Sequence, residues 1–246
     1  MRSIVSTANP LIKAVAALQQ ASVRRRERKT IVEGANALAM AVAADAHVVT
    51  VLTLDGAVPP VPDETELVVV SEAVLRKSAA TQHPAGPVAV VSIPDPTPPL
   101  RRDSVVLAGL GDPGNLGTII RTAVAFGVQP LVLPETTDVW SPKVLRAAAG
   151  AHWISPPVPV AGLADVRGLD LTIVAMVAEP GDRPESALAG ADPVAIVVGN
   201  EAHGLDPALV AAADRRLTIS MPGGMESLNA SVAAAIALYE RSRIRS

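Results

Sequence analysis

Ile219-Ser220-Met221-Pro222-Gly223-Gly224-Met225-Glu226-Ser227-Leu228-Asn229-Ala230-Ser231 is a glycine-kinked polar loop that follows an apolar strand and opens an Ala-rich helix. The Pro-Gly-Gly bend turns the chain sharply, because glycine adopts backbone conformations that other residues avoid. Ser227, Asn229 and Ser231 then offer hydroxyl and amide groups near a helix N-terminus, where backbone N–H groups lack partners. This layout predicts a ligand pocket, although taken alone it also fits an ordinary loop with a serine N-cap.

The composition is that of a folded protein with a large core. The chain has 246 residues, of which 49% are hydrophobic, enough for one large domain or two smaller ones. It contains no cysteine, which excludes disulfides and thiolate metal sites, and its four histidines show no metal-ligand spacing. We therefore expect no metal. Because we find no signal-peptide core and no 18-residue apolar run, we expect a cytoplasmic protein that does not enter a membrane.

A proline-dense segment predicts a division into two domains. Residues 94–99 cannot continue a helix or a central strand, so we expect residues 95–102 to be a linker. Residues 1–94 predict a small α/β domain with a helical pattern over 10–28. Residues 103–246 predict a parallel sheet covered on both faces, because apolar strands alternate with helical stretches. The expected strands are Val48–Leu54, Leu67–Val70, Val88–Ile93, Ser104–Leu107, Pro130–Leu133, Leu171–Val177, Val194–Val198 and Leu217–Met221.

The segment 109–117 formally matches G-x-G-x-x-G between a strand and a helix, so a dinucleotide site has to be considered. Asp112 places a negative charge there and Pro113 removes an N–H, and both are unfavourable for a pyrophosphate. The alternative is a turn that ends at Asn115, followed by a helix that carries Arg121. Because that helix is otherwise apolar, we expect its lone arginine to need a partner. Six residues separate the two side chains, so they need not share a helix face.

A second segment, Gly199-Asn200-Glu201-Ala202-His203-Gly204-Leu205, directly follows a buried strand. It places an amide and a carboxylate at the end of that strand, which is where α/β sheets bind small molecules. An ordinary turn with a surface acid is the alternative.

Together the three segments resemble the ordered motifs of the SpoU (SPOUT/TrmH-type) family of RNA ribose 2′-O-methyltransferases. The motifs are Asn115-x5-Arg121, Gly199-Asn200-Glu201-x2-Gly204-Leu205 and Ile219-x-Met221-x5-Ser227-Leu228-Asn229-x-Ser231. The first domain is similar to the L30e-like substrate-binding module of many members, through Ser6-x2-Asn9-Pro10-x-Ile12-Lys13, Val32-Glu33-Gly34 and His83-Pro84-x-Gly86. The sequence departs from the family in lacking an aromatic before Glu33-Gly34 and in having Met221 before Pro222.

The resemblance implies an α/β fold with a small N-terminal L30e-like domain and a C-terminal parallel-sheet SPOUT domain that contains a trefoil knot. It also implies a homodimer and S-adenosylmethionine as the cofactor. The implied cofactor-binding residues are Gly199, Ile219 and Leu228. The implied catalytic residues are Arg121 and Asn115 as the catalytic pair, with Glu201 and Asn229 shaping the pocket.

The expected activity is methyl transfer to a ribose 2′-hydroxyl in structured RNA. We expect ribosomal RNA rather than transfer RNA, because the first domain resembles a ribosomal protein. Methyl transfer from a sulfonium needs an aligned oxygen nucleophile and a route for its proton, but no metal. Arg121 either activates the hydroxyl, or grips the adjacent phosphate or the emerging alkoxide while water or another group takes the proton.

Two basic clusters are candidates for contacts with RNA phosphates, with solvated helix ends as the alternative. The cluster expected to bind RNA consists of Arg24, Arg25, Arg26, Arg28 and Lys29. The second cluster consists of Arg241, Arg243 and Arg245. A net charge of -3 argues against a surface that is basic throughout, and an aromatic content of 2% disfavours a base-stacking platform.

Two other classes of function remain as alternatives. The first is a nucleotide-dependent dehydrogenase that uses residues 109–114, and the second is a noncatalytic RNA-binding or ribosome-assembly protein.

Overall fold

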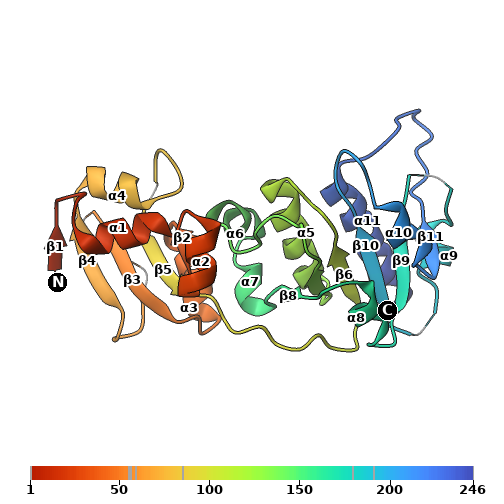
Figure 1. Ribbon diagram of the computed structural model, residues 1–246, viewed down its shortest axis with the longest axis horizontal. Coiled ribbons are helices and arrows are strands. Elements are labelled where there is room, and N and C mark those ends of the chain that lie inside the picture. The colour runs from red at the N-terminus through yellow and green to blue at the C-terminus, as the bar shows by residue number, and fades with distance from the viewer. Residues whose placement is uncertain are drawn as a thin grey trace. The chain divides into compact units, whose positions relative to one another are not determined.

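The protein forms two compact units in the computed structural model. Unit 1 consists of residues 1–95 and 140–154, and unit 2 consists of residues 96–139 and 155–246. Each unit is built on one sheet with helices on both faces, which confirms the expected α/β class (Figure 1). The functional division at residues 95–102 stays a prediction, as does the trefoil knot. The structure describes residues 2–54, 57–58, 60–84, 86–178, 180–190 and 192–245.

Unit 1 contains a five-stranded mixed sheet. Its strands are β1 (Arg2–Ile4), β2 (Lys29–Glu33), β3 (Val48–Thr53), β4 (Glu66–Val70) and β5 (Val88–Ser92). They lie in the order β1-β4-β3-β5-β2, with β5 antiparallel to both of its neighbours and the other pairs parallel. The helices are α1 (Pro10–Ala17), α2 (Ala21–Glu27), α3 (Ala35–Ala43), α4 (Glu72–Ser78), α6 (Pro142–Ala148) and α7 (Ala151–Ile154).

Alternating side chains bury both faces of this sheet, because successive residues of a strand point to opposite sides. Along β5, Val88 and Val90 enter the core formed with α1 and α4. Ala89 and Val91 enter the second core, formed with α3 and α6. The strands are therefore apolar on both sides, as the sequence of this segment predicts.

Two helices, α1 and α2, replace the single helix expected over residues 10–28. Gln20 lies between them in an extended conformation. The break is held by Arg24, which is buried and donates a hydrogen bond to the Leu18 carbonyl at 2.7 Å. A tertiary bond of this kind overrides helical periodicity, so the sequence pattern did not reveal the break.

Residues 140–154 form α6 and α7 inside unit 1, although they fall within the range expected for the second domain. Leu145 enters the same core as Val32. Arg146 pairs at 3.4 Å with the carboxylate of Glu33, whose side chain is only 6% exposed. The segment thus completes the second core of unit 1, and only contacts between residues distant in the sequence reveal this.

Unit 2 contains a six-stranded sheet in which every pair of strands is parallel. Its strands are β6 (Ser104–Leu107), β7 (Gln129–Val132), β8 (Val158–Pro159), β9 (Thr172–Met176), β10 (Val194–Val198) and β11 (Arg215–Leu217). They lie in the order β11-β9-β10-β6-β7-β8. The helices are α5 (Pro113–Ala125), α8 (Leu163–Arg167), α9 (Pro184–Ala187), α10 (Pro207–Ala211) and α11 (Ala230–Arg245). The parallel sheet is confirmed, but β11 ends at Leu217, so the residues expected to extend it lie in the following loop.

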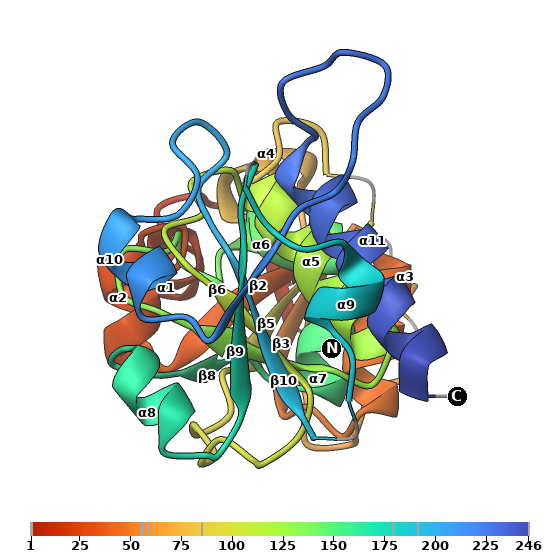
Figure 2. The same ribbon diagram turned by 90° about the vertical axis from the view of Figure 1, so that its right-hand side faces the viewer.

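Helices cover both faces of this sheet, with α5, α9 and α11 on one side and α8 and α10 on the other (Figure 2). The apolar strands β6 and β10 are buried along their whole length between these layers. Because all strands are parallel, their carboxyl ends share one edge, and the loops 199–206 and 218–229 rise from that edge (Figure 2). This edge is where an α/β sheet presents a ligand site.

A buried ion pair fastens α11 to the opposite edge of the sheet. Arg241, with a side chain only 1% exposed, donates two hydrogen bonds to Asp103, at 3.0 and 3.1 Å. Its remaining donors bond the carbonyls of Leu188, Gly190 and Asp192. All five donors of the guanidinium are thereby used, which is the condition for burying such a charge.

Burial raises the pKa of Asp103, but hydrogen bonds from Arg241, the Val194 N–H and Arg245, with the charge of Arg241, outweigh it and lower the pKa below its ordinary value. Because the folded-state pKa is the lower one, the carboxylate stabilises the fold above its ordinary pKa. That contribution is lost as the pH falls through the folded-state value.

Within the described ranges, no helix is long and apolar enough to cross a membrane. The same residues contain no group of three or more His, Cys, Asp or Glu side chains that would suit a metal ion.

Replacing Arg241 with methionine is expected to destabilise unit 2 by about 3–5 kcal/mol, because it strips a buried carboxylate of its main partner. Urea unfolding followed by far-UV circular dichroism measures the loss. Tryptophan fluorescence does not serve here, because both tryptophans, Trp140 and Trp153, lie in unit 1 and report on that unit. The matched control is Arg243→Met, which removes only an exposed pair with Glu240 and is expected to cost under about 1 kcal/mol. Equal losses in the two variants would contradict the structural role of Arg241.

Candidate functional site

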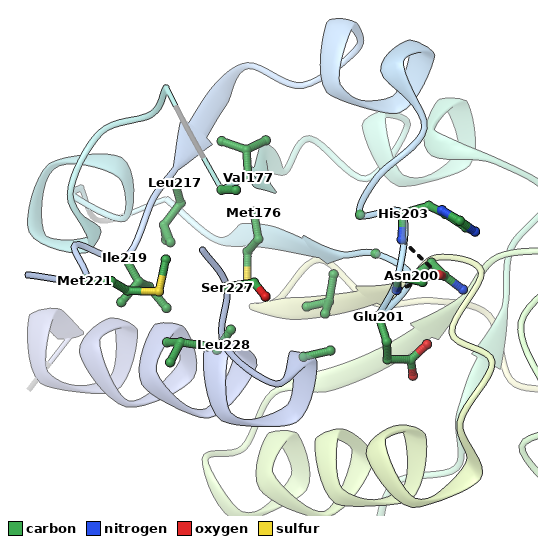
Figure 3. Close-up of a pocket in the computed structure, with 17 residues that line it drawn as sticks. Met176, Val177, Asn200, Glu201, His203, Leu217, Ile219, Met221, Ser227 and Leu228 are labelled. Atoms are coloured by element: carbon green, nitrogen blue, oxygen red, sulfur yellow. Dashed lines mark hydrogen bonds between the residues drawn. The ribbon is translucent and has the colours of Figure 1, made fainter. Parts of the chain in front are cut away.

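A pocket of about 360 Å³ opens at the carboxyl ends of β9, β10 and β11 (Figure 3). Its size lies in the range of small-molecule sites. Apolar side chains line one side and polar groups the other, so it suits a ligand with a flat apolar part and a polar part. The lining residues are Met176, Val177, Ala178, Val198, Gly199, Asn200, Glu201, Ala202, His203, Gly204, Leu217, Ile219, Met221, Ser227, Leu228, Ala230 and Ala233.

The loop after β10 folds back tightly on itself at Gly199. A Cβ atom on Gly199 would lie 2.6 Å from backbone atoms of Gly204, so no larger residue fits. Asn200 and Gly204 exchange backbone hydrogen bonds at 3.0 and 2.9 Å. The Asn200 side chain closes the turn by accepting from the N–H groups of Ala202 and His203. The loop therefore presents its backbone to the pocket in a fixed shape.

Glu201 connects this loop to the start of α5. Its carboxylate accepts hydrogen bonds from the backbone N–H groups of Gly111 and Asp112 and from the side chain of Asn115, each at 3.2 Å. In Figure 3 Glu201 lies at the far side of the pocket from Ile219. The carboxylate thus holds two distant segments in register, using the unpaired donors that precede a helix.

The hydrogen bonds also set the charge state of Glu201. Burial raises its pKa, but bonds from its own N–H, Asn115, Gly111 and Asp112 outweigh burial and lower the pKa below 4.5. Glu201 therefore remains an anion at neutral pH, because hydrogen bonds to the charged form favour that form.

The third motif joins the same network through Asn229. Its side-chain amide donates to the Asn115 side chain at 2.9 Å. Its side-chain oxygen caps α11 by accepting from the N–H groups of Ser231 and Val232. Glu201, Asn115 and Asn229 consequently form one continuous chain of hydrogen bonds. One residue from each of the three sequence motifs is thereby joined to the others by hydrogen bonds.

The apolar wall of the pocket comes from the strand ends and the loop before α11. Leu217 and Met176 lie at the ends of β11 and β9, and Ile219, Met221 and Leu228 stand opposite the polar loop in Figure 3. This wall matches the expected positions of Ile219 and Leu228. Together with the backbone groups of the loop after β10, it gives the pocket the mixed lining that a nucleoside requires.

Arg121 lies outside this pocket. It is exposed on α5, does not line the cavity, and forms no hydrogen bond or ion pair with any of the described residues. Arg121 lies six residues after Asn115 in α5, which corresponds to about 9 Å along the helix axis and puts the two side chains on different faces of the helix. The partner that we expect Arg121 to need is therefore not found among the described residues, and that expectation stays a prediction. The apolar residues face the core, and Arg121 faces outward.

The basic cluster at α2 is only partly available to a ligand. Arg24 is buried and donates to Leu18, so the structure does not support its expected contact with RNA. Arg26 pairs with Glu27, and Arg28 bonds the end of β5 and Asp95. Arg25 and Lys29 form no ion pair with a described residue.

The second basic cluster is structural. Arg241 and Arg245 both bond Asp103, and Arg243 pairs with Glu240 at 3.0 Å. The expectation that this group meets phosphates is therefore not supported. The spacing of basic residues in a sequence does not show which of them pairs with an acidic residue from another element.

The glycine-rich segment 109–117 does not form a dinucleotide cradle. Asp112 caps α5 by accepting from the N–H of Asn115 at 2.8 Å, so the helix begins earlier than the expected turn allowed. The N–H groups of Gly111 and Asp112 are already bonded to Glu201. A pyrophosphate would have to displace that carboxylate, which argues against the dehydrogenase alternative.

Asn200 was placed at the end of a strand by the sequence analysis but was not named among the catalytic or cofactor-binding residues. Besides closing its own turn, it donates to the Gly109 carbonyl at 2.9 Å and so joins the second motif to the first. The signal in the sequence is an asparagine at a strand end, because its side chain can accept from the N–H groups two and three residues ahead. Met176 was also missed, although the shared carboxyl edge of parallel strands predicts a contribution from β9.

Comparisons with known proteins agree with this geometry. Residues 103–239 match the SpoU rRNA methylase family, and residues 9–89 match the MRM3-like substrate binding domain. The chain is 31% identical over 244 residues to the 23S rRNA (guanosine(2553)-2′-O)-methyltransferase of Bacillus subtilis (strain 168), covering 97% of this chain and 98% of that protein.

Two solved structures with bound AdoMet are similar over nearly the whole chain. The SpoU methyltransferase AviRb from Streptomyces viridochromogenes in complex with AdoMet has a TM-score of 0.82 at 28% identity, covering 96% of this chain and 98% of that one. The AdoMet-bound rRNA methyltransferase from Sinorhizobium meliloti has a TM-score of 0.85 at 26% identity, covering 98% and 97%. The cofactor is S-adenosylmethionine, as expected.

Replacing Glu201 with glutamine is expected to raise the dissociation constant for S-adenosylhomocysteine about tenfold, because the neutral amide cannot accept all three bonds. Isothermal titration calorimetry measures the change, with Glu185→Gln, an exposed acid in α9 that does not line the pocket, as the control. Because hydrogen bonds hold the pKa of Glu201 below its ordinary value, wild-type affinity should persist through the pH range in which a free glutamate titrates and fall only below it. The glutamine variant should lack this fall; wild-type affinity in Glu201→Gln would refute the role of the carboxylate.

Proposed function

We propose that this chain modifies ribosomal RNA and holds its cofactor in the pocket between residues 199–204 and 219–228. The chain belongs to the SpoU rRNA methylase family and is an S-adenosylmethionine-dependent RNA ribose 2′-O-methyltransferase. The observation that carries this proposal is the convergence of three sequence motifs on one pocket through the Glu201, Asn115 and Asn229 network. A noncatalytic RNA-binding protein would have no need of that construction.

The cofactor is held mainly by main-chain groups. Gly199 allows the backbone of its loop to approach closely, and Ile219 and Leu228 provide apolar contact for the adenine. Glu201 and Asn229 act one step further out, because they fix the loops that carry these groups. When bound, the cofactor supplies an activated methyl group on a sulfonium.

The reaction forms a bond between the methyl carbon and the ribose O2′, breaks the bond between that carbon and sulfur, and releases the hydroxyl proton. Among the described residues that line the pocket, the ionisable side chains are those of Glu201 and His203. Glu201 is committed to its hydrogen bonds, and the His203 ring points away from the apolar wall (Figure 3). Water therefore takes the proton in our proposal. Arg121, a permanent cation, grips the neighbouring phosphate or stabilises the emerging alkoxide.

A homodimer explains why Arg121 points away from its own pocket. α5 and α11 pack together, and their outer side carries exposed apolar residues: Phe126 is 39% exposed, Val232 48% and Tyr239 51%. The rings of Phe126 and Tyr239 lie 6.3 Å apart, and Val232 stands seven residues before Tyr239, on the same side of α11. A second copy seated on this face would cover the apolar patch and bring two Arg121 residues near the shared interface.

Unit 1 selects the RNA in this proposal. Its residues 9–89 match a substrate-binding domain, and Arg25 and Lys29 are the members of the α2 cluster that carry charge without an ion-pair partner among the described residues. The scarcity of aromatic residues favours recognition of RNA shape and phosphates over base stacking. The preference for ribosomal RNA is supported by the 23S rRNA activity named for the Bacillus subtilis relative. Its place of action, which we propose to be the cytoplasm, follows from this substrate.

Purified protein is expected to transfer tritiated methyl groups from S-adenosylmethionine to ribosomal RNA from cells that lack it. Replacing Arg121 with alanine should lower the rate about a hundredfold, because it removes a donor to the developing charge. Mapping of 2′-O-methyl positions identifies the nucleotide. Arg183→Ala, in the segment before α9, is the control and should keep the wild-type rate. Methylation of transfer RNA alone would reverse the substrate assignment, and a full rate in Arg121→Ala would remove its catalytic role.

Sedimentation velocity tests the dimer. The 25.2 kDa chain is expected to sediment at twice that mass. Tyr239→Arg should shift it to a monomer, because it places a charge in the middle of the apolar patch. Leu100→Arg, at an exposed residue outside α5 and α11, should leave the dimer intact. A wild-type monomer at every concentration would contradict the proposed assembly.

A further inference from the structure

Thr136 and Thr137 lie outside the pocket and form hydrogen bonds to residues 107–112, the segment whose N–H groups donate to Glu201. The hydroxyl of Thr136 donates to the Leu107 carbonyl at 2.9 Å and accepts from the Gly109 N–H at 3.1 Å. It therefore bridges the two residues that flank the end of β6. Thr137 bonds the next part of the same segment, with its hydroxyl donating to the Gly111 carbonyl at 2.8 Å and its N–H donating to the Leu110 carbonyl at 3.0 Å.

The segment 107–112 lies between these threonines and the cofactor loop. On one side it is bonded by Thr136 and Thr137. On the other side, the Gly109 carbonyl accepts from Asn200, and the N–H groups of Gly111 and Asp112 donate to Glu201. Ordering the segment 107–112 costs conformational entropy, so three of its groups would not stay aligned on the loop 199–204 without further contacts. The hydrogen bonds of Thr136 and Thr137 provide those contacts on the opposite side of the segment.

The turn that presents the threonines is itself strained. Glu135, directly before Thr136, has a φ of 69°, a left-handed conformation that non-glycine residues rarely adopt. Strain of this kind persists only where surrounding contacts over-determine it, and it gathers near functional sites. The four bonds made by the two threonines are contacts of that kind.

We propose that Thr136 and Thr137 are positioning residues for the cofactor pocket: their hydrogen bonds fix the segment 107–112, which in turn fixes Glu201 and the loop 199–204. This inference rests on the proposed location of the cofactor. Neither threonine lines the pocket, so neither contacts the ligand. Their effect reaches it through Gly111, Asp112 and Glu201, and through the bond between Gly109 and Asn200.

Valine replaces threonine with nearly the same shape and no hydroxyl, so Thr136→Val and Thr137→Val remove only the bonds. Thr137→Val removes one hydrogen bond and is expected to raise the dissociation constant for S-adenosylhomocysteine about fivefold; Thr136→Val removes two and should raise it at least as much. Thr136→Ser keeps the hydroxyl and should restore wild-type affinity. The control is Thr65→Val in unit 1, which removes a hydroxyl bond to the Val48 carbonyl without a link to the pocket. It should lower the melting temperature and leave the affinity unchanged.

Hydrogen exchange of the ligand-free protein separates this inference from the cofactor assignment. Exchange of the amides at Gly111 and Asp112 should speed up at least fivefold in Thr136→Val and Thr137→Val but not in Thr65→Val. If the wild type does not bind S-adenosylhomocysteine but exchange at Gly111 and Asp112 is still faster in the two valine variants, the proposed cofactor location is wrong. The threonines would then still restrain the segment 107–112. Unchanged exchange and affinity in both valine variants, or a serine variant as weak as the valine one, would overturn the positioning role.

Discussion

The carboxylate of Glu201 is the contact on which the site depends, because it joins elements that the chain itself keeps far apart. It accepts from Gly111, Asp112 and Asn115, and Asn115 in turn accepts from Asn229 at the start of α11. Asn200 adds a second link between the same loops by donating to the Gly109 carbonyl. One anion, kept charged by its own hydrogen bonds, gives them a common reference point.

Unit 2 separates stability from ligand binding by using opposite edges of its sheet. At the amino edge, the Asp103 and Arg241 pair fastens the last turns of α11 to the starts of β6 and β10. At the carboxyl edge, the first turn of α11 forms part of the pocket. The same helix is therefore anchored at one end by a buried charge pair and carries the site at the other. The anchor sets where the site lies without occupying it.

The parallel sheet and the convergence of the three motifs were predictable, because both follow from local patterns. Apolar strands that alternate with helices put their carboxyl ends at one edge, and residues that follow those strands must then meet. A cap before the Ala-rich run was also expected, but the serine named for it is not the cap, because Asn229 accepts from the N–H groups of Ser231 and Val232.

Arg24 is bound locally, by the Leu18 carbonyl at the end of the preceding helix. Most of the failures share one physical cause, which is the approach of a partner from a distant element. Arg241 looks like a free surface cation in the sequence, but Asp103 draws it inward. The packing of residues 140–154 within unit 1 likewise depends on contacts with Glu33 and Val32 that no local pattern encodes. The orientation of Arg121 depends on which face of α5 meets the core.

A crystal structure of the protein with S-adenosylhomocysteine tests the central claim most directly. The account predicts the adenosine between residues 199–204 and 219–228, with Glu201 still bonded to Gly111 and Asp112. The ligand bound elsewhere, or a Glu201 carboxylate detached from those N–H groups in the complex, would contradict it.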